Sequence, residues 1–143
     1  MSKSNTFETD LLQLIFNGTA IANLADNAAS APLTNLFVAL HTADPGEAGT
    51  QSTSEVTYTG YARVAVARTA GGWTVSAGSV SPTNNIEFGE MTAGTPGTAT
   101  HATIGTAASG TGKVLYRGAL TPSIAYAVGV IPRIKNTSTI TED

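Results

Sequence analysis

Apolar residues near the start of the chain recur at the spacing of an amphipathic helix. Phe7, Leu11 and Ile15 follow one another at i, i+4 intervals, and Leu12 and Phe16 repeat that interval one position later. The two series together place a broad apolar stripe along one side of a helix. The pattern therefore predicts an N-terminal helix, with a strand inside this Leu-, Ile- and Phe-rich run as the alternative.

The two ends of this predicted helix carry their own signals. Asn5 and Glu8 stand at the spacing of a capping box, with Asn in place of the usual Ser or Thr, and Glu8 also suits the positive end of the helix dipole. Asn17 and Gly18 are typical of a helix end. The helix is thus expected to begin directly after Asn5 and to end near Asn17.

A second, shorter helix is expected directly afterwards. Thr19 is placed to cap a helix over residues 20–26, and the Ala- and Ser-rich run up to Pro32 is typical of a linker. Residues 1–34 are therefore predicted to form an N-terminal helical arm.

From residue 35 onward the pattern becomes that of β-strands. Residues 36–41 are continuously apolar, which indicates a strand buried on both faces, and residues 61–68 alternate, with Val64 and Val66 on one face. Further strands are expected over residues 73–75, around Val80, and over residues 86–88, 98–105, 113–120, 123–128 and 130–134.

The connections between these strands decide the fold class. Asp44-Pro45-Gly46 has turn chemistry, and residues 47–60 read as a long polar loop with at most an edge strand near residues 56–58. None of the later connections has a helical period, which argues against a parallel α/β fold. The prediction is a mainly β protein: an antiparallel, jelly-roll-like β-sandwich over residues 35–143, one structural unit, with the helical segment outside or across it.

Composition narrows the classes of function. The 143 residues carry a net charge of −3, a pI of about 5.2 and only 12% charged residues, so no basic face is available for nucleic acid. No apolar run is long enough to span a membrane, and no secretory leader is recognised. The chain has no cysteine, which excludes disulfides and thiolate metal sites. We expect a domain made in the cytoplasm, without a nucleic-acid or membrane partner.

Candidate chemistry is sparse along the chain. His41, Asp44 and Glu47 surround a turn and raise the idea of a metal site, but Asp44 is better explained as a turn former beside Pro45. His101 lies in a predicted strand, where a structural role is expected. No metal and no cofactor are therefore predicted.

Two further patterns resemble catalytic or binding motifs only in part. Residues 109–113 resemble a phosphate-binding loop, but Ala107 and Val114 occupy its two defining positions, so a hairpin loop is expected instead. Glu87 and Glu90 are explained as solvated acids beside a turn. The four tyrosines are spread along the chain and predict no clustered aromatic ladder. These observations predict a protein that is not an enzyme.

The candidate contact residues are apolar. Phe7, Leu11 and Ile15 form a helix face that either packs on the β domain or binds a partner. Trp73, the single Trp, is either a core anchor or an interface residue, a place where Trp is enriched. Many core positions hold Ala or Gly, so oligomerisation or docking on a partner would supply stability that a small core lacks.

Two stretches of the chain resemble a known family. They are Leu40-His41-Thr42-Ala43-Asp44-Pro45-Gly46-Glu47-Ala48-Gly49 followed by Glu55-Val56 and Gly60-Tyr61-Ala62-Arg63-Val64, and the run from Ile104 to Leu120. Over about residues 35–120 the chain resembles small virion proteins of tailed bacteriophages, which include tail-fibre-like and capsid cement (decoration) proteins.

The resemblance implies a non-enzymatic virion component. The leading expectation is a capsid cement protein on the capsid exterior, which binds and stabilises the major capsid protein shell and pairs with itself as a homodimer or a trimer. The alternative is a tail fibre, tip or baseplate component that contacts the host surface. A third class, a polysaccharide hydrolase, would need an acid pair in a cleft.

Overall fold

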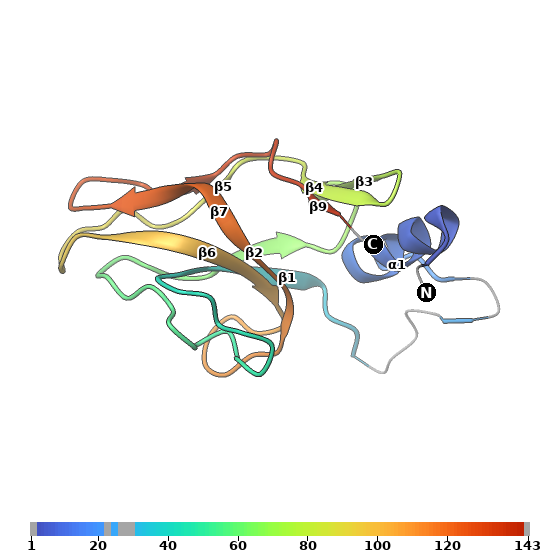
Figure 1. Ribbon diagram of the computed structural model, residues 1–143, viewed down its shortest axis with the longest axis horizontal. Coiled ribbons are helices and arrows are strands. Elements are labelled where there is room, and N and C mark those ends of the chain that lie inside the picture. Colours follow the sequence, from blue (N-terminus) through green and yellow to red (C-terminus); the bar gives the residue numbers. More distant parts are fainter. Residues whose placement is uncertain (1–2, 22–23, 26–30, 142–143) are drawn as a thin grey trace. The chain divides into compact units, whose positions relative to one another are not determined.

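The computed structural model describes residues 3–21, 24–25 and 31–141 (Figure 1). Its elements are α1 (Asn5–Asn17), β1 (Asn35–His41), β2 (Val64–Ala67), β3 (Trp73–Ser76), β4 (Ser79–Pro82), β5 (Ile86–Glu87), β6 (Gly97–Gly105), β7 (Val114–Tyr126), β8 (Arg133–Ile134) and β9 (Ile140–Thr141). Within the described residues the strands form sheets of order β2-β1-β6-β7, β3-β4-β9 and β5-β8. The predicted mainly β, antiparallel fold with an N-terminal helical segment is confirmed, whereas its jelly-roll arrangement is not.

The chain folds into two compact units. The first unit contains Met1–Asn35, Val66–Ile86 and Ile134–Asp143, and the second contains Leu36–Ala65 and Glu87–Arg133. The chain therefore passes between the units four times, and neither unit is one continuous stretch of sequence.

The helix α1 begins one residue earlier than its capping-box signal predicts. Ser4 is the N-cap, and its side chain accepts a hydrogen bond from the Phe7 N–H at 3.4 Å, while Asn5 is already helical. The C-terminal prediction is confirmed, because Gly18 adopts φ 64° and its N–H bonds the Gln13 carbonyl. In the part of the chain that the structure describes, no helix is long and apolar enough to cross a membrane.

The second predicted helix is wrong where it can be compared. Ile21 and Ala25 exchange two backbone hydrogen bonds as an isolated bridge, and neither they nor Leu24 are helical. The rest of the predicted 20–26 helix, apart from Ala20, lies outside the described residues. The backbone groups of Ile21 and Ala25 satisfy each other, so these residues need no helix for their hydrogen bonds.

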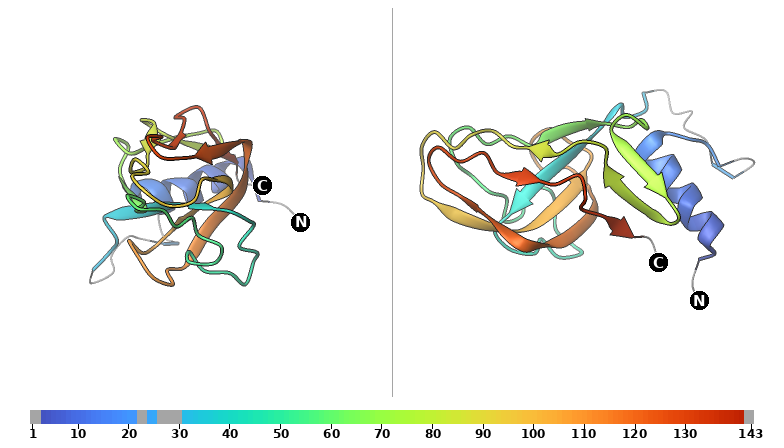
Figure 2. Two further views of the ribbon diagram at one scale, coloured as in Figure 1. Left: turned by 90° about the vertical axis from the view of Figure 1, so that its left-hand side faces the viewer. Right: turned by 90° about the horizontal axis from the view of Figure 1, so that it is seen from above.

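The core of the first unit forms where α1 meets the β3–β4 hairpin (Figure 2). Leu12 and Phe16 are fully buried on α1, and Phe16 packs edge-to-face on Trp73 with ring centroids 4.8 Å apart. The hairpin also bonds the helix, since the Gly78 N–H donates to Thr9 Oγ1 at 3.0 Å. The apolar stripe predicted for the helix thus packs through Leu12 and Phe16.

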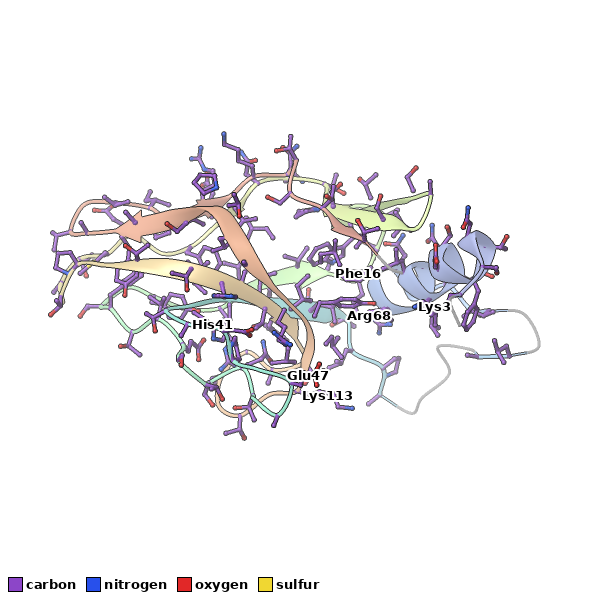
Figure 3. All side chains as sticks on the ribbon, in the orientation of Figure 1. Lys3, Phe16, His41, Glu47, Arg68 and Lys113 are labelled. Atoms are coloured by element: carbon purple, nitrogen blue, oxygen red, sulfur yellow. The ribbon has the colours of Figure 1, made fainter. Side chains whose placement is uncertain are left out.

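Arg68 holds the C-terminal end of α1 in place (Figure 3). Its Nε donates to the Ile15 carbonyl at 2.7 Å and its Nη2 to the Leu14 carbonyl at 2.9 Å. Its Nη1 donates to the Leu33 carbonyl at 2.7 Å. A cation at this position also complements the negative end of the helix dipole.

The second unit is built on the antiparallel pairing of β1, β6 and β7. Val38 pairs with Ile104 and Ile104 with Tyr116, so these three side chains share one face of the sheet. Ala39, Thr103 and Arg117 follow the same rule on the opposite face. The strand β1 is buried from Val38 to His41 on both faces, as its continuous apolar pattern predicts.

The strand β7 is a single strand where the sequence predicts two. Its register against β6 shifts between Ala99 and His101, so that β7 carries extra residues around Pro122. Pro has no N–H for a sheet ladder, and a bulge accommodates it at the edge of the sheet. The predicted break at Pro122 is therefore an irregularity within β7.

Candidate functional site

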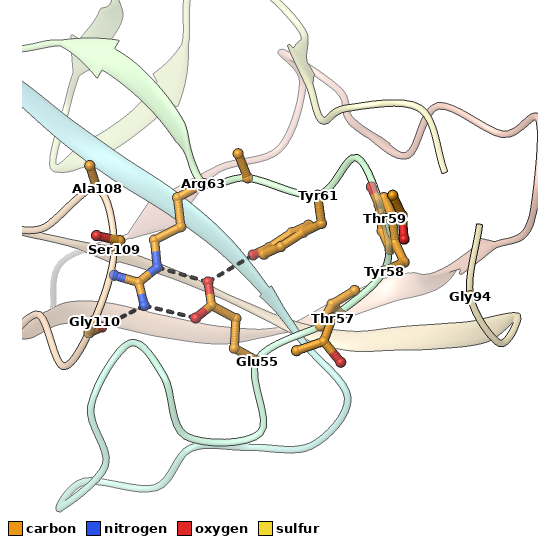
Figure 4. Close-up of a pocket in the computed structure, with 12 residues that line it drawn as sticks. Glu55, Thr57, Tyr58, Thr59, Tyr61, Arg63, Gly94, Ala108, Ser109 and Gly110 are labelled. Atoms are coloured by element: carbon orange, nitrogen blue, oxygen red, sulfur yellow. Dashed lines mark hydrogen bonds and ion pairs between the residues drawn. The ribbon is translucent and has the colours of Figure 1, made fainter. Parts of the chain in front are cut away.

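A hollow of about 600 Å³ opens on the second unit (Figure 4). Its wall consists of residues 55–59, residues 61–63, Gly94 and residues 108–110. The polar loop 47–60, predicted from composition, therefore supplies much of the lining.

Arg63 is the centre of the polar network beside this hollow. Its Nε and Nη2 donate to the two carboxylate oxygens of Glu55 at 2.7 and 2.8 Å. Its Nη1 donates to the Ala107 carbonyl at 2.9 Å, and Nη2 donates a second bond to the Gly110 carbonyl at 2.7 Å. The Arg63 side chain is 2% exposed and that of Glu55 15%, so the fork-shaped pair is almost dry. Arg63 thus ties the loop of Glu55 to the β6–β7 hairpin.

Tyr61 extends the same network. Its hydroxyl donates to Glu55 Oε1 at 3.1 Å and accepts the backbone N–H of Leu40 at 3.0 Å. Burial raises the pKa of Tyr61, and the neighbouring Glu55 carboxylate raises it further, so the phenol stays protonated. Glu55 therefore accepts three hydrogen bonds from within the protein.

Three of the four tyrosines, although spread along the chain, form an aromatic cluster with Phe88. The Tyr58 ring lies 5.4 Å from that of Tyr61 and 5.3 Å from that of Tyr126, and Tyr61 stacks on Phe88 at 6.0 Å. Tyr58, Tyr126 and Phe88 are buried, so the cluster is core and offers no open ladder for a sugar. These rings come from distant stretches of the chain, so no local sequence pattern predicts the cluster.

His41 is fully buried and both of its ring nitrogens are used. Nδ1 lies 2.8 Å from the Thr53 carbonyl and Nε2 lies 2.8 Å from Thr103 Oγ1. Because a carbonyl only accepts, we assign the proton to Nδ1, and Nε2 then accepts from the Thr103 hydroxyl. Burial lowers the pKa of His41, which agrees with a neutral ring. This histidine is a structural clamp for the polar loop.

Gln51 closes the same loop from within. Its Nε2 donates to the Phe37 carbonyl at 3.1 Å, and its Oε1 accepts the Ala107 N–H at 3.0 Å. A Cβ at Gly105 would lie 2.2 Å from Gln51 Cδ, so only glycine leaves room for this side chain.

Asp44 and Glu87 each form an ion pair, and Asp44 also closes a turn. Asp44 Oδ1 accepts the Gly46 N–H at 2.9 Å, which confirms the turn interpretation, and Arg117 binds the same carboxylate at 2.6 Å. The Gly46 N–H, followed by Arg117, holds the pKa of Asp44 below its usual value. Glu87 pairs with Arg133 at 2.5 Å. Among the described residues, no three His, Asp or Glu side chains form a group that could hold a metal.

The predicted contact residues lie in the first unit. Phe7, Leu11 and Ile15 are half-buried on α1, while the fully buried residues of the helix are Leu12 and Phe16. Trp73 is 1% exposed, and its role as a core anchor accounts for this burial. Sequence reasoning missed the exposed apolar residues Val128, Val130 and Ile131, which it assigned to strands.

The contacts of the polar loop 47–60 also give a structural role to the motifs that carry the resemblance. The Glu55-Val56 and Gly60-Tyr61-Ala62-Arg63 stretches contain the three side chains that meet beside the hollow. Glu55 and Arg63 carry opposite charges within a weakly charged stretch, and this is the signal in the sequence that they could pair.

The family comparison places the chain among bacteriophage virion structural proteins, and the chain is a member of a family of phage fibre proteins. The family is described as Gp80, Podophage GP4 fiber I protein gp80, and its model matches residues 2–141. The resemblance to a phage virion family is thereby confirmed. Among curated proteins, none matches the chain.

Proposed function

We propose that this protein is a non-enzymatic fibre subunit of a bacteriophage virion. The observation that carries the proposal is the match of the fibre-protein family over residues 2–141. Of the two roles expected from sequence, the family description favours the fibre over the capsid cement protein.

The geometry of the hollow supports a structural role. A catalytic acid or base has to exchange a proton with its substrate. Glu55 instead accepts three internal hydrogen bonds, and Arg63 is bonded to a carboxylate and two carbonyls. Such a network fixes the shape of a loop, which suits a subunit that presents a rigid surface.

The half-buried face of α1 is a candidate contact with another virion protein. Leu12 and Phe16 already bury the helix in its own unit, so the outer parts of Phe7, Leu11 and Ile15 are available to a neighbour. Replacing Leu11 by Asp should then prevent incorporation into particles while the purified chain still unfolds cooperatively. If the variant is neither incorporated into particles nor able to unfold cooperatively, Leu11 serves only the core.

Copy number and position in the particle test the proposed function. Purified virions are separated into heads and tails, and the protein is quantified by mass spectrometry relative to the major capsid protein. A fibre subunit is expected at far lower copy number than the capsid protein, with antibody label on projecting fibres in electron micrographs.

Two results would contradict the proposal. A copy number close to that of the major capsid protein, together with heat-sensitive heads when the protein is removed, would instead identify a cement protein. Turnover of a host polysaccharide by the purified chain would refute the non-enzymatic role.

A further inference from the structure

Asn17 and Gly18 form the only Asn-Gly pair in the sequence, and they lie at the C-terminal end of α1. An asparagine followed by glycine is the pair most prone to lose its side-chain amide, because glycine has no Cβ to hinder attack by its own backbone nitrogen. Gly18 stands here for another reason, since the helix cap requires its left-handed conformation, φ 64°. The feature that ends the helix is therefore also a reactive one.

The reaction of such a pair needs only water. The Gly18 nitrogen attacks Cγ of Asn17 and forms a new C–N bond, while Asn17 Nδ2 leaves as ammonia and takes up the proton that the Gly18 nitrogen loses. The product is a five-membered succinimide ring. Water then adds to one of the two ring carbonyls and opens the ring to aspartate or to isoaspartate, in which the main chain runs through the former side chain.

The attacking and the leaving nitrogen are both bonded to one residue, Gln13. The Gly18 N–H donates to the Gln13 carbonyl, which also accepts the Thr19 N–H at 3.0 Å. Asn17 Nδ2 donates to Gln13 Oε1 at 2.8 Å in a part-buried contact. To close the ring, the Gly18 nitrogen has to give up its proton and the Asn17 side chain has to turn toward it, which breaks these bonds. Gln13 therefore protects Asn17 as long as the cap is closed.

Opening of the cap involves only the last residues of the helix. Phe16 is fully buried, and Arg68 donates to the two carbonyls before it, so α1 is fixed up to this residue. From Thr19 onward the chain is exposed. Helix ends open at a lower free-energy cost than their packed middle. The Asn-Gly pair lies at the boundary between the two, where a local opening leaves the rest of the helix in place.

Neither product of the reaction restores the cap. An aspartate at position 17 places a carboxylate at the negative end of the helix dipole and lacks the donor to Gln13 Oε1. In the part of the chain that the structure describes, Asn17 Oδ1 is buried with no hydrogen-bond partner, so a carboxylate oxygen there would be buried without a donor. Isoaspartate adds one carbon to the main chain and moves the Gly18 and Thr19 N–H groups out of register with the Gln13 carbonyl. The conversion thus leads one way, from a capped to an uncapped helix.

We propose that Asn17 is a modification site at which the folded protein slowly deamidates, that Gln13 governs the rate, and that conversion loosens the packing of α1 on Trp73. The substrate is the chain itself and the co-reactant is water. The inference goes beyond the proposed function and does not depend on it, because it follows from the end of α1 alone.

Peptide mapping by mass spectrometry tests the site. The full-length chain is kept at mildly alkaline pH, and the aspartate and isoaspartate forms of the peptide that contains Asn17 are separated and quantified over time. Conversion in the folded chain should be measurable and slower, on the order of tenfold or more, than in guanidinium chloride, where the three hydrogen bonds to Gln13 are absent. A folded chain that never converts at Asn17, or one that converts as fast as the unfolded chain, would overturn the inference.

Variants of Gln13 test what governs the rate. Gln13→Ala removes the acceptor of Asn17 Nδ2 but keeps the backbone carbonyl and a good helix former, so conversion should be about two- to tenfold faster, the factor that one hydrogen bond contributes. Gln13→Glu is the matched control, since it keeps an acceptor oxygen at this place and should convert at the wild-type rate. Circular dichroism establishes that both variants retain the helix. Equal rates in Gln13→Ala and wild type would contradict the role of Gln13.

Trp73 fluorescence tests the consequence for α1. Phe16, the residue before Asn17, packs on the Trp73 ring with centroids 4.8 Å apart (Figure 3). Asn17→Asp should move the emission to longer wavelength and lower the urea concentration at which the chain unfolds, and so should wild-type protein aged until Asn17 has converted. Asn17→Gln is the control, because it stays neutral and its longer side chain does not form the five-membered ring. If Asn17→Asp and the aged protein match Asn17→Gln in emission and unfolding, conversion leaves α1 packed and the inference is wrong.

Discussion

Arg63 and Glu55 form a buried ion pair in a protein that has few charged residues. Removing two charges from water is costly, and the cost is met only when every donor and lone pair finds a good partner. Arginine suits this position because its planar fork reaches both carboxylate oxygens and two carbonyls at once, whereas an ammonium group cannot. The side chain therefore specifies how the loop and the hairpin meet.

Replacing Arg63 by Lys should lower the free energy of unfolding by about 1–3 kcal/mol, because at least one buried acceptor loses its donor. Urea unfolding followed by circular dichroism measures the difference. Arg133→Lys is the matched control: its pair with Glu87 is half-exposed, and such pairs contribute about 0–1 kcal/mol. Equal losses in the two variants would mean that the buried geometry of Arg63 contributes nothing special.

His41 should make the folded state sensitive to mild acid. Burial lowers its pKa below the ordinary value of 6.5, so the unfolded chain binds a proton at a pH where the folded chain does not. The stabilising contribution is complete above pH 6.5 and is lost as the pH falls from there toward the folded-state pKa. The free energy of unfolding should therefore fall between pH 7.5 and about pH 5, a range in which most carboxylates stay ionised.

The variant His41→Gln isolates this effect. It retains a donor and an acceptor but does not titrate, so its stability should be lower at pH 7.5 and should change less between pH 7.5 and 5. Parallel slopes for wild type and variant would show that His41 is not the group responsible.

At the scale of elements, the helix α1 shows how burial and not residue type determines the cost of a change. Leu11 and Leu12 are neighbours with the same side chain, yet Leu12 is fully buried and Leu11 is half-buried. Leu12→Ala should lower the free energy of unfolding by about 2–5 kcal/mol, in the usual range for a cavity in a core. Leu11→Ala should lower the free energy of unfolding by clearly less than Leu12→Ala does. Thermal and urea unfolding of the pair decide this, and a larger loss at Leu11 would contradict the packing described.

Elements with a strong local pattern could be predicted from sequence, and those set by distant contacts could not. The helix stripe with its Gly18 end and the apolar run of β1 are local, and both are found as expected. The strand β9 is only two residues long and is recognisable only by its pairing with Ser79 and Val80, so no local pattern predicts it. The network of the candidate site could not be predicted for the same reason, since Arg63 binds carbonyls 44 and 47 residues further along the chain.

At the scale of the whole molecule, the fold mixes distant parts of the sequence within each unit. The first unit combines the N-terminal segment with Val66–Ile86 and the C-terminal segment. Its core therefore depends on residues contributed by separate stretches, among them Phe16 on α1 and Trp73 on β3. The sequence predicts an arm over residues 1–34 and a separate domain over residues 35–143, and deletion of the arm tests whether that domain keeps its core without it.

Deleting residues 1–34 should expose Trp73 to water, because Phe16 covers its ring from α1. Trp73 is the single Trp, so its fluorescence reports this one site without interference. Emission should move to longer wavelength, iodide should quench it more strongly, and the truncated chain should unfold at lower urea concentration than the full chain. The variant Leu12→Ala serves as an intermediate, since it keeps the helix but loosens its packing. Emission unchanged by the deletion would show that residues 35–143 cover Trp73 by themselves, and the helix would then be available, as the face of Leu11 suggests, for a partner in the particle.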